Sequence, residues 1–574
     1  MAIAPHKTES WLLDSESEKR IREQIEQERS QITVKKRFRS IMKTFTKHGL
    51  LYLLRDSAIL NLFGKRRSRE EEEVLRRVGH RLRLAFEELG PTFIKLGQVL
   101  VTRQELLPDA ITGELAKLLD KVPPVPFSHL ALYLKEELPE GLDTFEWISD
   151  TPIGSGSLAQ VYKAQLKDGK PCAVKIVRPT VDKLFETDIK VIKRFVKRIQ
   201  KRLPDEYVVS LDLTGLINDY YSSSMNELDM RREAQTMAEH RSLIEEFEHL
   251  RMPRVYFSSR HVLITEYIDG WNIKEFPVDF LTFEERLERQ LDLAHWYILM
   301  IVEGYYHADV HGSNIMIERA SKKAVIIDWG MAGRMDSIHA EALFRLLLHI
   351  RLNQIEDAAE AALDILHPTS YTDPVRLKDQ LRSNLINYVN SEQGSDYNWG
   401  NLLLQLITIG VKNYCRIPNG LALWAKGFSA AEGTARWLCP EISFHHTVET
   451  SDVQVLRKIL SRRFNFRANA SLIAETAKLV ASFPRRMNKI LDKLAWNDFK
   501  IPVEYNVSDR SIREAHRVVN RLILGIMASG FFVGSSLMIT FGGPSFQTVP
   551  KILMWAAVAV SVYVLWRIKR SKRA

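Results

Sequence analysis

Short apolar runs in the middle of the chain predict buried β-strands. Cys172–Ile176 is one such run, and its only charged residue is Lys175. Lys323–Ile327 is a second run, which leads directly to Asp328, and Val262–Ile264 is a third. A lysine at an apolar strand position is costly unless its ammonium group has an anionic partner. The pattern therefore predicts that Lys175 meets an anion inside the fold, and a nucleotide phosphate together with a carboxylate would serve.

Longer stretches have the spacing of apolar residues that is typical of helices. Arg69–Leu89, Asn226–Ala234 and Ile338–Ile350 are each predicted to be helical. Residues 335–500 as a whole are predicted to be mainly helical. Breaks are expected near Pro368, Gly394, Pro418, Asn419, Gly420 and Pro440.

A basic amphipathic stretch runs from Lys35 to about Leu54. Such a stretch can lie on an anionic membrane surface, or it can pack on the folded domain as a helix with a solvated basic face. The sequence leaves both arrangements open. Residues 1–30 are too acidic for a typical organellar transit peptide and lack the apolar core of a secretory signal.

Two uncharged apolar runs lie near the end of the sequence. Leu522–Phe541 has twenty residues, enough to span the ~30 Å hydrocarbon core of a bilayer as a helix, and Ile552–Trp566 follows after a short loop. Basic residues flank the pair on both sides, whereas the loop between the runs has only Lys551. By the positive-inside rule, the pair is predicted to be a transmembrane hairpin with both ends in the cytoplasm.

Composition narrows the class of protein. The 574 residues suggest several domains, and 45% hydrophobic with 26% charged residues is typical of a globular chain. The net charge of +10 is compatible with nucleic-acid binding, but the sequence has no zinc-finger spacing, RNA-binding aromatic motif or Lys/Arg repeat. The three cysteines form no Cys-x-x-Cys pair, so neither a disulfide framework nor a zinc site is expected. We therefore predict no nucleic-acid partner.

The candidate chemistry is concentrated in His307–Asn314 and at Asp328. Asp309, Asn314 five positions later, and Asp328 at the end of a strand form the set that phosphoryl transfer requires. One aspartate lies near the nucleophile, while the asparagine and the second aspartate hold Mg²⁺ across the phosphates. Their order and spacing predict the catalytic and metal-binding half of a kinase-like site.

The other half of such a site lies upstream, in a small-residue loop that precedes a strand-like run. Backbone N–H groups in this loop can approach phosphate oxygens because no bulky Cβ intervenes. Lys175 follows on the next strand, and Glu233 is the candidate carboxylate for its ammonium group. A solvated helix face beside Arg231 and Arg232 is an equal alternative for Glu233. The loop residues are Ile153, Gly154, Ser155, Gly156 and Ser157.

Two further motifs are absent from ordinary protein kinases. Phe93–Gln98 contains a Lys-x-Gly-Gln signature with Lys95 and Gln98, and a Glu-x-Asp signature falls on Glu227 and Asp229. With both motifs in order around a kinase-like core, the chain resembles the UbiB/ADCK family of atypical kinase-like proteins over roughly residues 75–500.

The resemblance implies roles for the residues of the core. Lys175 would pair with Glu233 and the nucleotide phosphates, and ATP and Mg²⁺ would be the cofactors. Asp309 would be catalytic, and Asn314 and Asp328 would bind the metal.

The resemblance also implies roles around the core. Lys95 would support catalysis from a helical extension folded over the pocket, where Lys95 and Gln98 would meet Glu227 and Asp229. Glu266 and Ile268, which follow the strand Val262–Ile264, would belong to the hinge that contacts adenine. A plain exit from the strand is the alternative for these two residues.

Several positions depart from the family or from ordinary kinases. Glycines occupy the nucleotide loop where the family usually has alanines, His311–Asn314 alters the usual His-Pro-Gly-Asn turn, and Trp329 stands where phenylalanine is common. Ala308 replaces the arginine of many protein kinases, and no Ala-Pro-Glu or long activation segment follows Gly330. A protein substrate would have little platform, so an ATPase-like, small-molecule or lipid-directed activity is favoured.

We therefore expect an α+β, protein-kinase-like two-lobed fold with a helical N-terminal extension and a C-terminal transmembrane hairpin. The expected domains are a helical basic region (1–74), the extension (75–149), an N-lobe (150–270), a helical C-lobe (271–510) and the hairpin with its basic tail (511–574).

The resemblance implies an atypical kinase-like ATPase that supports isoprenoid quinone (ubiquinone) biosynthesis by handling lipid intermediates. Its expected location is the bacterial inner membrane, as a multi-pass protein with a cytoplasmic kinase-like domain. Membrane lipids, a quinone precursor and quinone-synthesis enzymes are the expected partners, and a homodimer is one arrangement. A small-molecule or lipid kinase and a nucleotide-binding scaffold without turnover stay open as alternatives.

Overall fold

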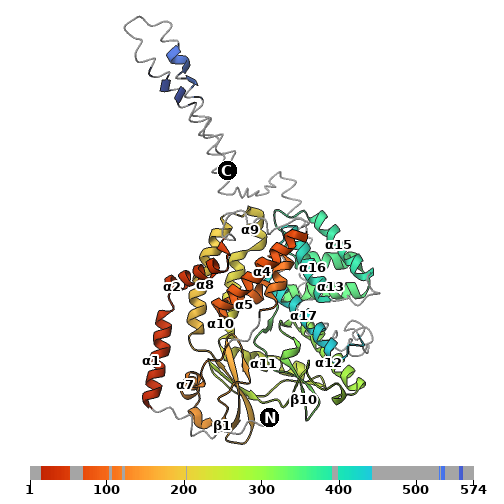
Figure 1. Ribbon diagram of the computed structural model, residues 1–574. Helices are drawn as coiled ribbons and strands as arrows, with labels where there is room; N and C mark the ends of the chain where they lie inside the picture. Colours follow the sequence, from red (N-terminus) through yellow and green to blue (C-terminus); the bar gives the residue numbers. More distant parts are fainter. Residues whose placement is uncertain are drawn as a thin grey trace, which may run out of the picture. The chain divides into compact units, whose positions relative to one another are not determined.

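The computed structural model describes residues 15–51, 69–101, 107–118, 123–201, 203–390 and 399–442, together with isolated helical residues between 526 and 561. The chain divides into two compact units, Met1–Ala468 and Asn469–Ala574. Figure 1 shows the first unit with its helices and strands labelled. The site described below lies entirely within this unit.

The N-lobe is built on an antiparallel sheet in the order β1-β3-β4-β7-β6, with β2 paired to β3. Residues alternate between the two faces of a strand, so in β4 Cys172, Val174 and Ile176 are fully buried on one face. Helix α7 (Phe127–Glu137) packs on that face. Lys175 therefore lies on the opposite face of the sheet. The strands are β1 (Phe145–Ile148), β2 (Gly154–Ser155), β3 (Ala159–Leu166), β4 (Pro171–Val177), β6 (Val255–Ser258) and β7 (Val262–Glu266).

Four helices lie between β4 and β6: α8 (Val181–Gln200), α9 (Asp205–Leu211), α10 (Leu213–Glu227) and α11 (Met230–Ile244). Helices α8 and α10 share a hydrophobic core with helices that precede the lobe in the sequence, and Figure 1 shows α4 and α5 beside α8 and α10. The preceding helices are α1 (Ser15–Gln31), α2 (Val34–Lys47), α4 (Arg69–Leu89), α5 (Pro91–Val101) and α6 (Asp109–Leu115). The N-terminal extension is thus joined to the kinase-like core by an insertion within the N-lobe.

The C-lobe surrounds helix α12 (Phe283–Glu303), which begins at a capping box between Thr282 and Glu285. It ends at Gly304, whose φ of 75° suits glycine and turns the chain into β9 (Tyr305–His307). A sheet in the order β5-β11-β10-β8 and a β9–β12 pair complete the site side of this lobe. The other strands are β5 (Leu250–Arg251), β8 (Gly270–Asn272), β10 (Ile315–Glu318), β11 (Ala324–Ile326) and β12 (Ala332–Arg334).

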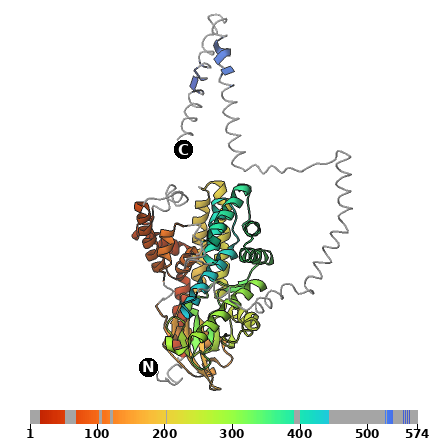
Figure 2. The same cartoon turned by 90° about the vertical axis from the view of Figure 1, so that its right-hand side faces the viewer.

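In the described part of the C-lobe, five further helices surround a core that contains Trp296, Trp329 and Trp424. Figure 2 shows α17 running through the middle of the unit. The helices are α13 (Ser337–Arg351), α14 (Ile355–Ile365), α15 (Pro374–Asn390), α16 (Trp399–Lys412) and α17 (Asn419–Leu438). The two-lobed, kinase-like architecture and the mainly helical character of residues 335–390 and 399–442 confirm the predictions made from the sequence, whereas residues 391–398 and 443–500 of the predicted helical region lie outside the described residues.

The element predictions have mixed outcomes. The helix at Arg69–Leu89 is confirmed as α4, and the helix at Ile338–Ile350 is confirmed within α13. One continuous helix over Asn226–Ala234 is wrong. Helix α10 ends at Glu227, and Asp229 caps α11 by accepting a hydrogen bond from the backbone N–H of Arg231. Aspartate favours this N-cap position over a helix interior, which explains the break.

The basic stretch after Lys35 packs on the folded unit. Arg37 of α2 donates to both carboxylate oxygens of Asp188 on α8, at 2.6 and 2.8 Å. Ile41 is buried, and Phe38 stacks on Phe195. These contacts correspond to the packed helix, one of the two arrangements that the sequence left open.

The predicted transmembrane hairpin falls almost entirely outside the described residues. Within Leu522–Phe541 and Ile552–Trp566, the described residues are single positions or stretches of at most five residues (532–536), and these are helical. A search restricted to the described residues finds no helix with the length and apolar character needed to cross a membrane.

Candidate active site

Lys175, Glu233 and Asp328 meet between the two lobes. The ammonium group of Lys175 on β4 lies 2.8 and 3.0 Å from the carboxylate oxygens of Glu233 on α11, and 3.5 Å from Oδ1 of Asp328. Glu233 is 7% exposed and also accepts a hydrogen bond from the backbone N–H of Trp329. The solvated alternative for Glu233 therefore does not apply, because the helix buries this carboxylate against the lysine.

Burial and charge shift the pKa values of this cluster. Burial works against the charged form of Lys175, but Asp328 and Glu233 outweigh it and raise the pKa of the lysine. Burial raises the pKa of Glu233, while the charge of Lys175 holds the pKa of Asp328 below its usual value despite burial. Near neutral pH, Lys175 and Asp328 thus face each other as a cation and an anion.

The catalytic loop brings Asp309 and Asn314 together. The side-chain amide of Asn314 donates to the backbone carbonyl and to Oδ2 of Asp309, both at 3.0 Å. Asp309 is also approached by His311 Nε2 at 3.3 Å and by Lys426 Nζ at 3.3 Å. Although burial acts in the opposite direction, His311 and Lys426 hold the pKa of Asp309 well below its usual range. Asp309 is therefore a carboxylate at neutral pH.

His307 links this loop to the segment that carries Asp328. Its Nε2 lies 2.8 Å from the backbone carbonyl of Asp328, and its Nδ1 accepts from the backbone N–H of Asp309 at 3.3 Å. These contacts require a neutral ring with its hydrogen on Nε2, and burial lowers the pKa of His307 accordingly. His307 is fully buried against Trp329, so the large aromatic residue fills core space behind the site.

The nucleotide loop is a hairpin between β2 and β3, in which Gly154 pairs with Val161 and Ser155 with Gln160. A Cβ at Gly154 would lie 3.8 Å from Val161, and one at Gly156 would lie 3.5 Å from the carbonyl oxygen of Ala159. These are ordinary contact distances, so the loop has room for the alanines that are usual in the family. Ile153 and Ser157 flank the turn. The side chain of Ile153 is half-exposed, whereas Ser157 is buried.

Arg178, which the sequence did not single out, holds this loop in place through hydrogen bonds. Its guanidinium donates to the carbonyl of Gly156 at 2.9 Å, to Ser155 Oγ at 2.8 Å and to the carbonyl of Pro123 at 2.9 Å. It is 5% exposed. Its position, directly after the end of β4, gave no signal that would distinguish it from a surface arginine.

The predicted hinge connects the two lobes. Glu266 ends β7 of the N-lobe sheet, and Gly270 begins β8, which pairs with β10 of the C-lobe. The Glu266 carboxylate accepts from Arg251 at 3.0 and 3.1 Å, so its side chain stabilises the connection. Ile268 is 5% exposed and places an apolar side chain at this crossing. The segment thus joins the lobes in the manner of a kinase hinge.

The extension reaches the site through Lys95. Lys95 on α5 donates to Glu227 at the end of α10, and the two side chains are 8% and 13% exposed. Burial raises the pKa of Glu227, whose Oε1 receives no hydrogen bond from the described residues. Gln98, one turn further along α5, is half-buried. Lys95 and Glu227 are therefore brought together as the resemblance implied.

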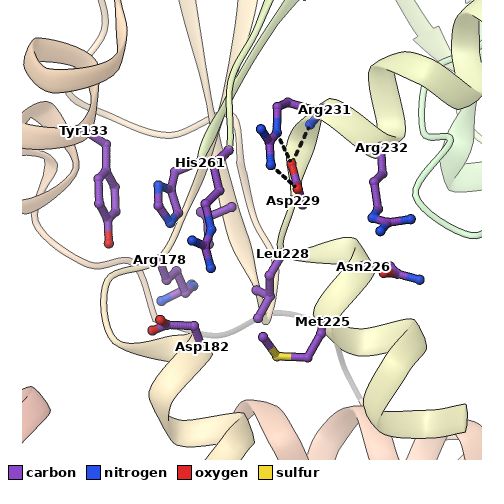
Figure 3. A pocket seen from close by; sticks show the side chains of 12 residues that line it. Tyr133, Arg178, Asp182, Met225, Asn226, Leu228, Asp229, Arg231, Arg232 and His261 are labelled. Atoms are coloured by element: carbon purple, nitrogen blue, oxygen red, sulfur yellow. Dashed lines mark hydrogen bonds and ion pairs between the residues drawn. The ribbon is translucent and has the colours of Figure 1, made fainter.

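Asp229 does not join that pair. Its carboxylate caps α11 and accepts from the guanidinium of Arg231 at 2.7 and 2.8 Å. Figure 3 shows Arg231 turned back over Asp229, while Arg232 points to the other side of the helix. They line a small polar pocket of about 160 Å³ that also contains Arg178 and His261. Asp229 therefore sets where α11 begins, and through that helix it fixes the position of Glu233.

A larger cavity of about 620 Å³ opens beside Lys95 and Glu227. Its wall includes Val99 of α5, Leu216 of α10 and Leu421 of α17. The short segment that follows Asp328 forms another side, because β12 leads directly into α13. The extension and this short segment thus occupy the region where a protein kinase would present its activation segment.

The donor set fits Mg²⁺ and a nucleotide. Both amide hydrogens of Asn314 are directed at Asp309, which leaves the amide oxygen facing away from it. The side chain of Asp328 is 42% exposed and supplies a carboxylate. No group of three or more His, Cys, Asp and Glu side chains suited to a metal occurs in the part of the chain that the structure describes. One carboxylate and one amide oxygen are nevertheless typical for Mg²⁺, which retains waters and takes further ligands from phosphates.

A two-lobed fold with a strand lysine paired to a helix glutamate, and with these aspartates and asparagine facing it, defines a kinase-like protein. The sequence matches the ABC1 atypical kinase-like domain over residues 117–362 and the ABC1/UbiB kinase-like C-terminal domain over residues 506–570. It is 30% identical over 383 residues to a "Probable protein kinase UbiB" of Pseudomonas paraeruginosa, covering 65% of this chain and 70% of that protein. The chain belongs to the UbiB family of ABC1 atypical kinase-like proteins, as predicted.

Two other similarities extend the comparison. The chain is 28% identical over 549 residues to an "Uncharacterized protein in hydrogenase 1 5'region" of Clostridium pasteurianum, covering 93% of this chain and 99% of that one. Among solved structures, it is similar to a Mycobacterium tuberculosis protein determined with erythromycin, with 25% identity and a TM-score of 0.42, over 65% of this chain and 95% of that chain.

Proposed function

We propose that this chain is an ATP- and Mg²⁺-dependent atypical kinase-like ATPase that supports isoprenoid quinone biosynthesis, most familiarly that of ubiquinone. The observation that carries the proposal is the cluster of Lys175, Glu233 and Asp328. Burying Glu233 beside Lys175 is costly without a further role, and the lysine also faces the partly exposed carboxylate of Asp328 beside the catalytic loop. The quinone assignment rests on membership of the UbiB family.

The arrangement supports phosphoryl transfer from ATP. Lys175 would hold the phosphates nearer the adenine, and Asn314 with Asp328 would hold Mg²⁺ across them. The bond from the γ-phosphorus to its bridging oxygen breaks, ADP leaves with the electron pair, and a new bond forms to the acceptor oxygen. Asp309 orients that acceptor and is placed to receive its proton. With water as the acceptor, the products are ADP and inorganic phosphate.

The surroundings of the site favour water or a small or lipid acceptor over a protein. The extension covers the site from one side through Lys95 and Glu227. The adjoining 620 Å³ cavity has a mainly apolar wall and could receive part of a lipid intermediate. We also propose that membrane lipids and a quinone precursor are partners of this protein.

Membrane attachment is the remaining part of the proposal. The uncharged runs at residues 522–541 and 552–566, with basic residues on both outer sides, support a hairpin that leaves the kinase-like unit in the cytoplasm. In a bacterium, this corresponds to the inner membrane. Hydrolysis near the bilayer would then drive movements of the extension that present a lipid intermediate.

The test is phosphate release from Mg²⁺-ATP by the purified full chain, with and without liposomes. We expect lipid-stimulated release that Asp328→Asn abolishes. The matched control is Asp379→Asn, the same change at an exposed position on α15, which should leave the rate unaltered. ADP formation matched by a phosphorylated acceptor instead of free phosphate would favour a small-molecule or lipid kinase. Tight ATP binding without ADP formation would favour a nucleotide-binding scaffold.

A further inference from the structure

Helix α17 is fastened to the catalytic loop at two points. At Gly427 the helix touches the loop so closely that a Cβ would lie 2.2 Å from the carbonyl oxygen of His307 and 3.0 Å from the Cα of Ala308. Seven residues further on, the hydroxyl of Thr434 donates to the carbonyl of Val310 at 2.8 Å. The helix and the loop therefore hold a fixed relative position on both sides of Asp309.

This packing places Lys426 at the catalytic aspartate. Its Nζ lies 3.3 Å from Oδ1 of Asp309, and its side chain is 32% exposed. The catalytic loop from His307 to Asn314 contains no lysine or arginine of its own. Lys426 thus supplies a permanent cation beside Asp309, while Lys175 supplies one beside Asp328.

We propose that Lys426 is a catalytic residue that binds the γ-phosphoryl group of ATP and stabilises its charge during transfer. The inference rests on the proposed function, because it requires ATP in the site. The oxygens of the transferring group carry the charge that develops in the reaction, and a cation already in position stabilises it without reorganisation. Lys426 takes up no proton in this step, since it acts only as a charge.

The geometry fits a phosphate ligand better than a purely structural ion pair. Asp309 occupies one of the three donors of the ammonium group, and the partial exposure of Lys426 leaves the ammonium group accessible to a further acceptor. An ion pair with this exposure contributes little to stability by itself. The close approach at Gly427 fixes the backbone of Lys426, so the remaining freedom is that of a lysine side chain.

The test compares the affinities for Mg²⁺-ATP and Mg²⁺-ADP, which differ by the γ-phosphoryl group. We expect Lys426→Met to weaken ATP binding about tenfold, equivalent to about 1.4 kcal/mol, with less than a twofold change for ADP. Lys426→Arg keeps the charge and should restore most of the preference for ATP. Lys412→Met, at an exposed lysine ending the neighbouring α16, is the matched control and should change neither affinity.

The outcomes separate this inference from the proposed function. Equal weakening of ATP and ADP in Lys426→Met, or no weakening of either, would overturn the role of Lys426 while leaving the proposed function intact. If the wild-type chain bound ATP without turnover, the proposed ATPase activity would be refuted. The affinity comparison would still test whether Lys426 binds the γ-phosphoryl group. A wild-type chain that binds neither nucleotide would overturn both. Thermal unfolding of each variant shows that the affinities refer to folded protein.

Discussion

Two glycines of helix α17 should respond in opposite ways to the same substitution. Both Gly427 and Gly433 lie inside the helix, at Asn419–Leu438. At Gly433 a Cβ would meet nothing within 4 Å, whereas at Gly427 it would meet the carbonyl oxygen of His307 at 2.2 Å and the hydroxyl of Tyr297 at 2.5 Å. Ordinary contact begins at 3.4 Å, so the helix or the loop would have to move by roughly 1.2 Å at Gly427.

The magnitudes follow from these contacts. Replacing a helical glycine by alanine stabilises the helix by about 0.5–1 kcal/mol where space allows, which is the result expected for Gly433→Ala. Overpacking typically costs about 1–3 kcal/mol, and at Gly427 the obstructing atoms include backbone, which cannot rotate away. The gain in helix propensity is common to both positions, so we expect Gly427→Ala to be destabilising overall and less stable than Gly433→Ala by about 1–3 kcal/mol, the cost of overpacking.

Urea unfolding of the full chain, followed by tryptophan fluorescence, measures this difference. Trp296, Trp329 and Trp424 are all fully buried in the C-lobe and report on its unfolding. The displacement should also separate Lys426 from Asp309, so Gly427→Ala should weaken ATP binding while Gly433→Ala should not. Equal unfolding midpoints for the two variants would refute the close packing of α17 on the catalytic loop.

Two further predictions concern buried charge. Burial lowers the pKa of His240 on α11 to about 4. In the unfolded chain the imidazole has a higher pKa and therefore takes up a proton first as the pH falls. The free energy of unfolding should thus be highest above about pH 6.5 and decline towards pH 4. His240→Phe should reduce the decline between pH 7 and pH 5 by roughly 2 kcal/mol, measured by urea unfolding at these two pH values, and an unchanged decline would contradict the assignment. Lys95→Leu should cost about 3–5 kcal/mol, because it leaves the buried Glu227 without its partner, whereas the double substitution with Glu227→Leu should recover much of the loss. Simple addition of the two single effects in unfolding experiments would show that the pair is not coupled.

The sequence predicted which of the candidate side chains come together, because these residues lie in short contiguous motifs. Asp309 and Asn314 are five positions apart on one turn, and Asp328 directly follows a buried strand, so local geometry nearly determines where they meet. Alternation along β4 likewise separates Lys175 from the apolar face. Such patterns require only the period of the element and not the packing of distant helices.

Other parts depend on tertiary packing that leaves no local pattern. Lys426 lies 117 positions after Asp309, on a helix without any recognised motif. The packing of this helix on the catalytic loop at Gly427 brings the two side chains together. The break at Asp229 was missed because the surrounding residues are acceptable in a helix, and the cap is visible only from its hydrogen bond to Arg231. In each case the decisive information is which surfaces touch, and a single sequence does not contain it.

The contacts of Arg178 connect the nucleotide loop to the extension. Its guanidinium holds the carbonyls of both Gly156 and Pro123, and Gln160 on the adjoining strand exchanges two hydrogen bonds with the backbone of Val125. A loop that moves to admit or release phosphates must therefore either break these bonds or carry residues 123–125 with it. Breaking them would leave a buried guanidinium without partners, which is the costlier course. Movement of the nucleotide loop and movement of residues 123–125 are thus coupled through Arg178 and Gln160.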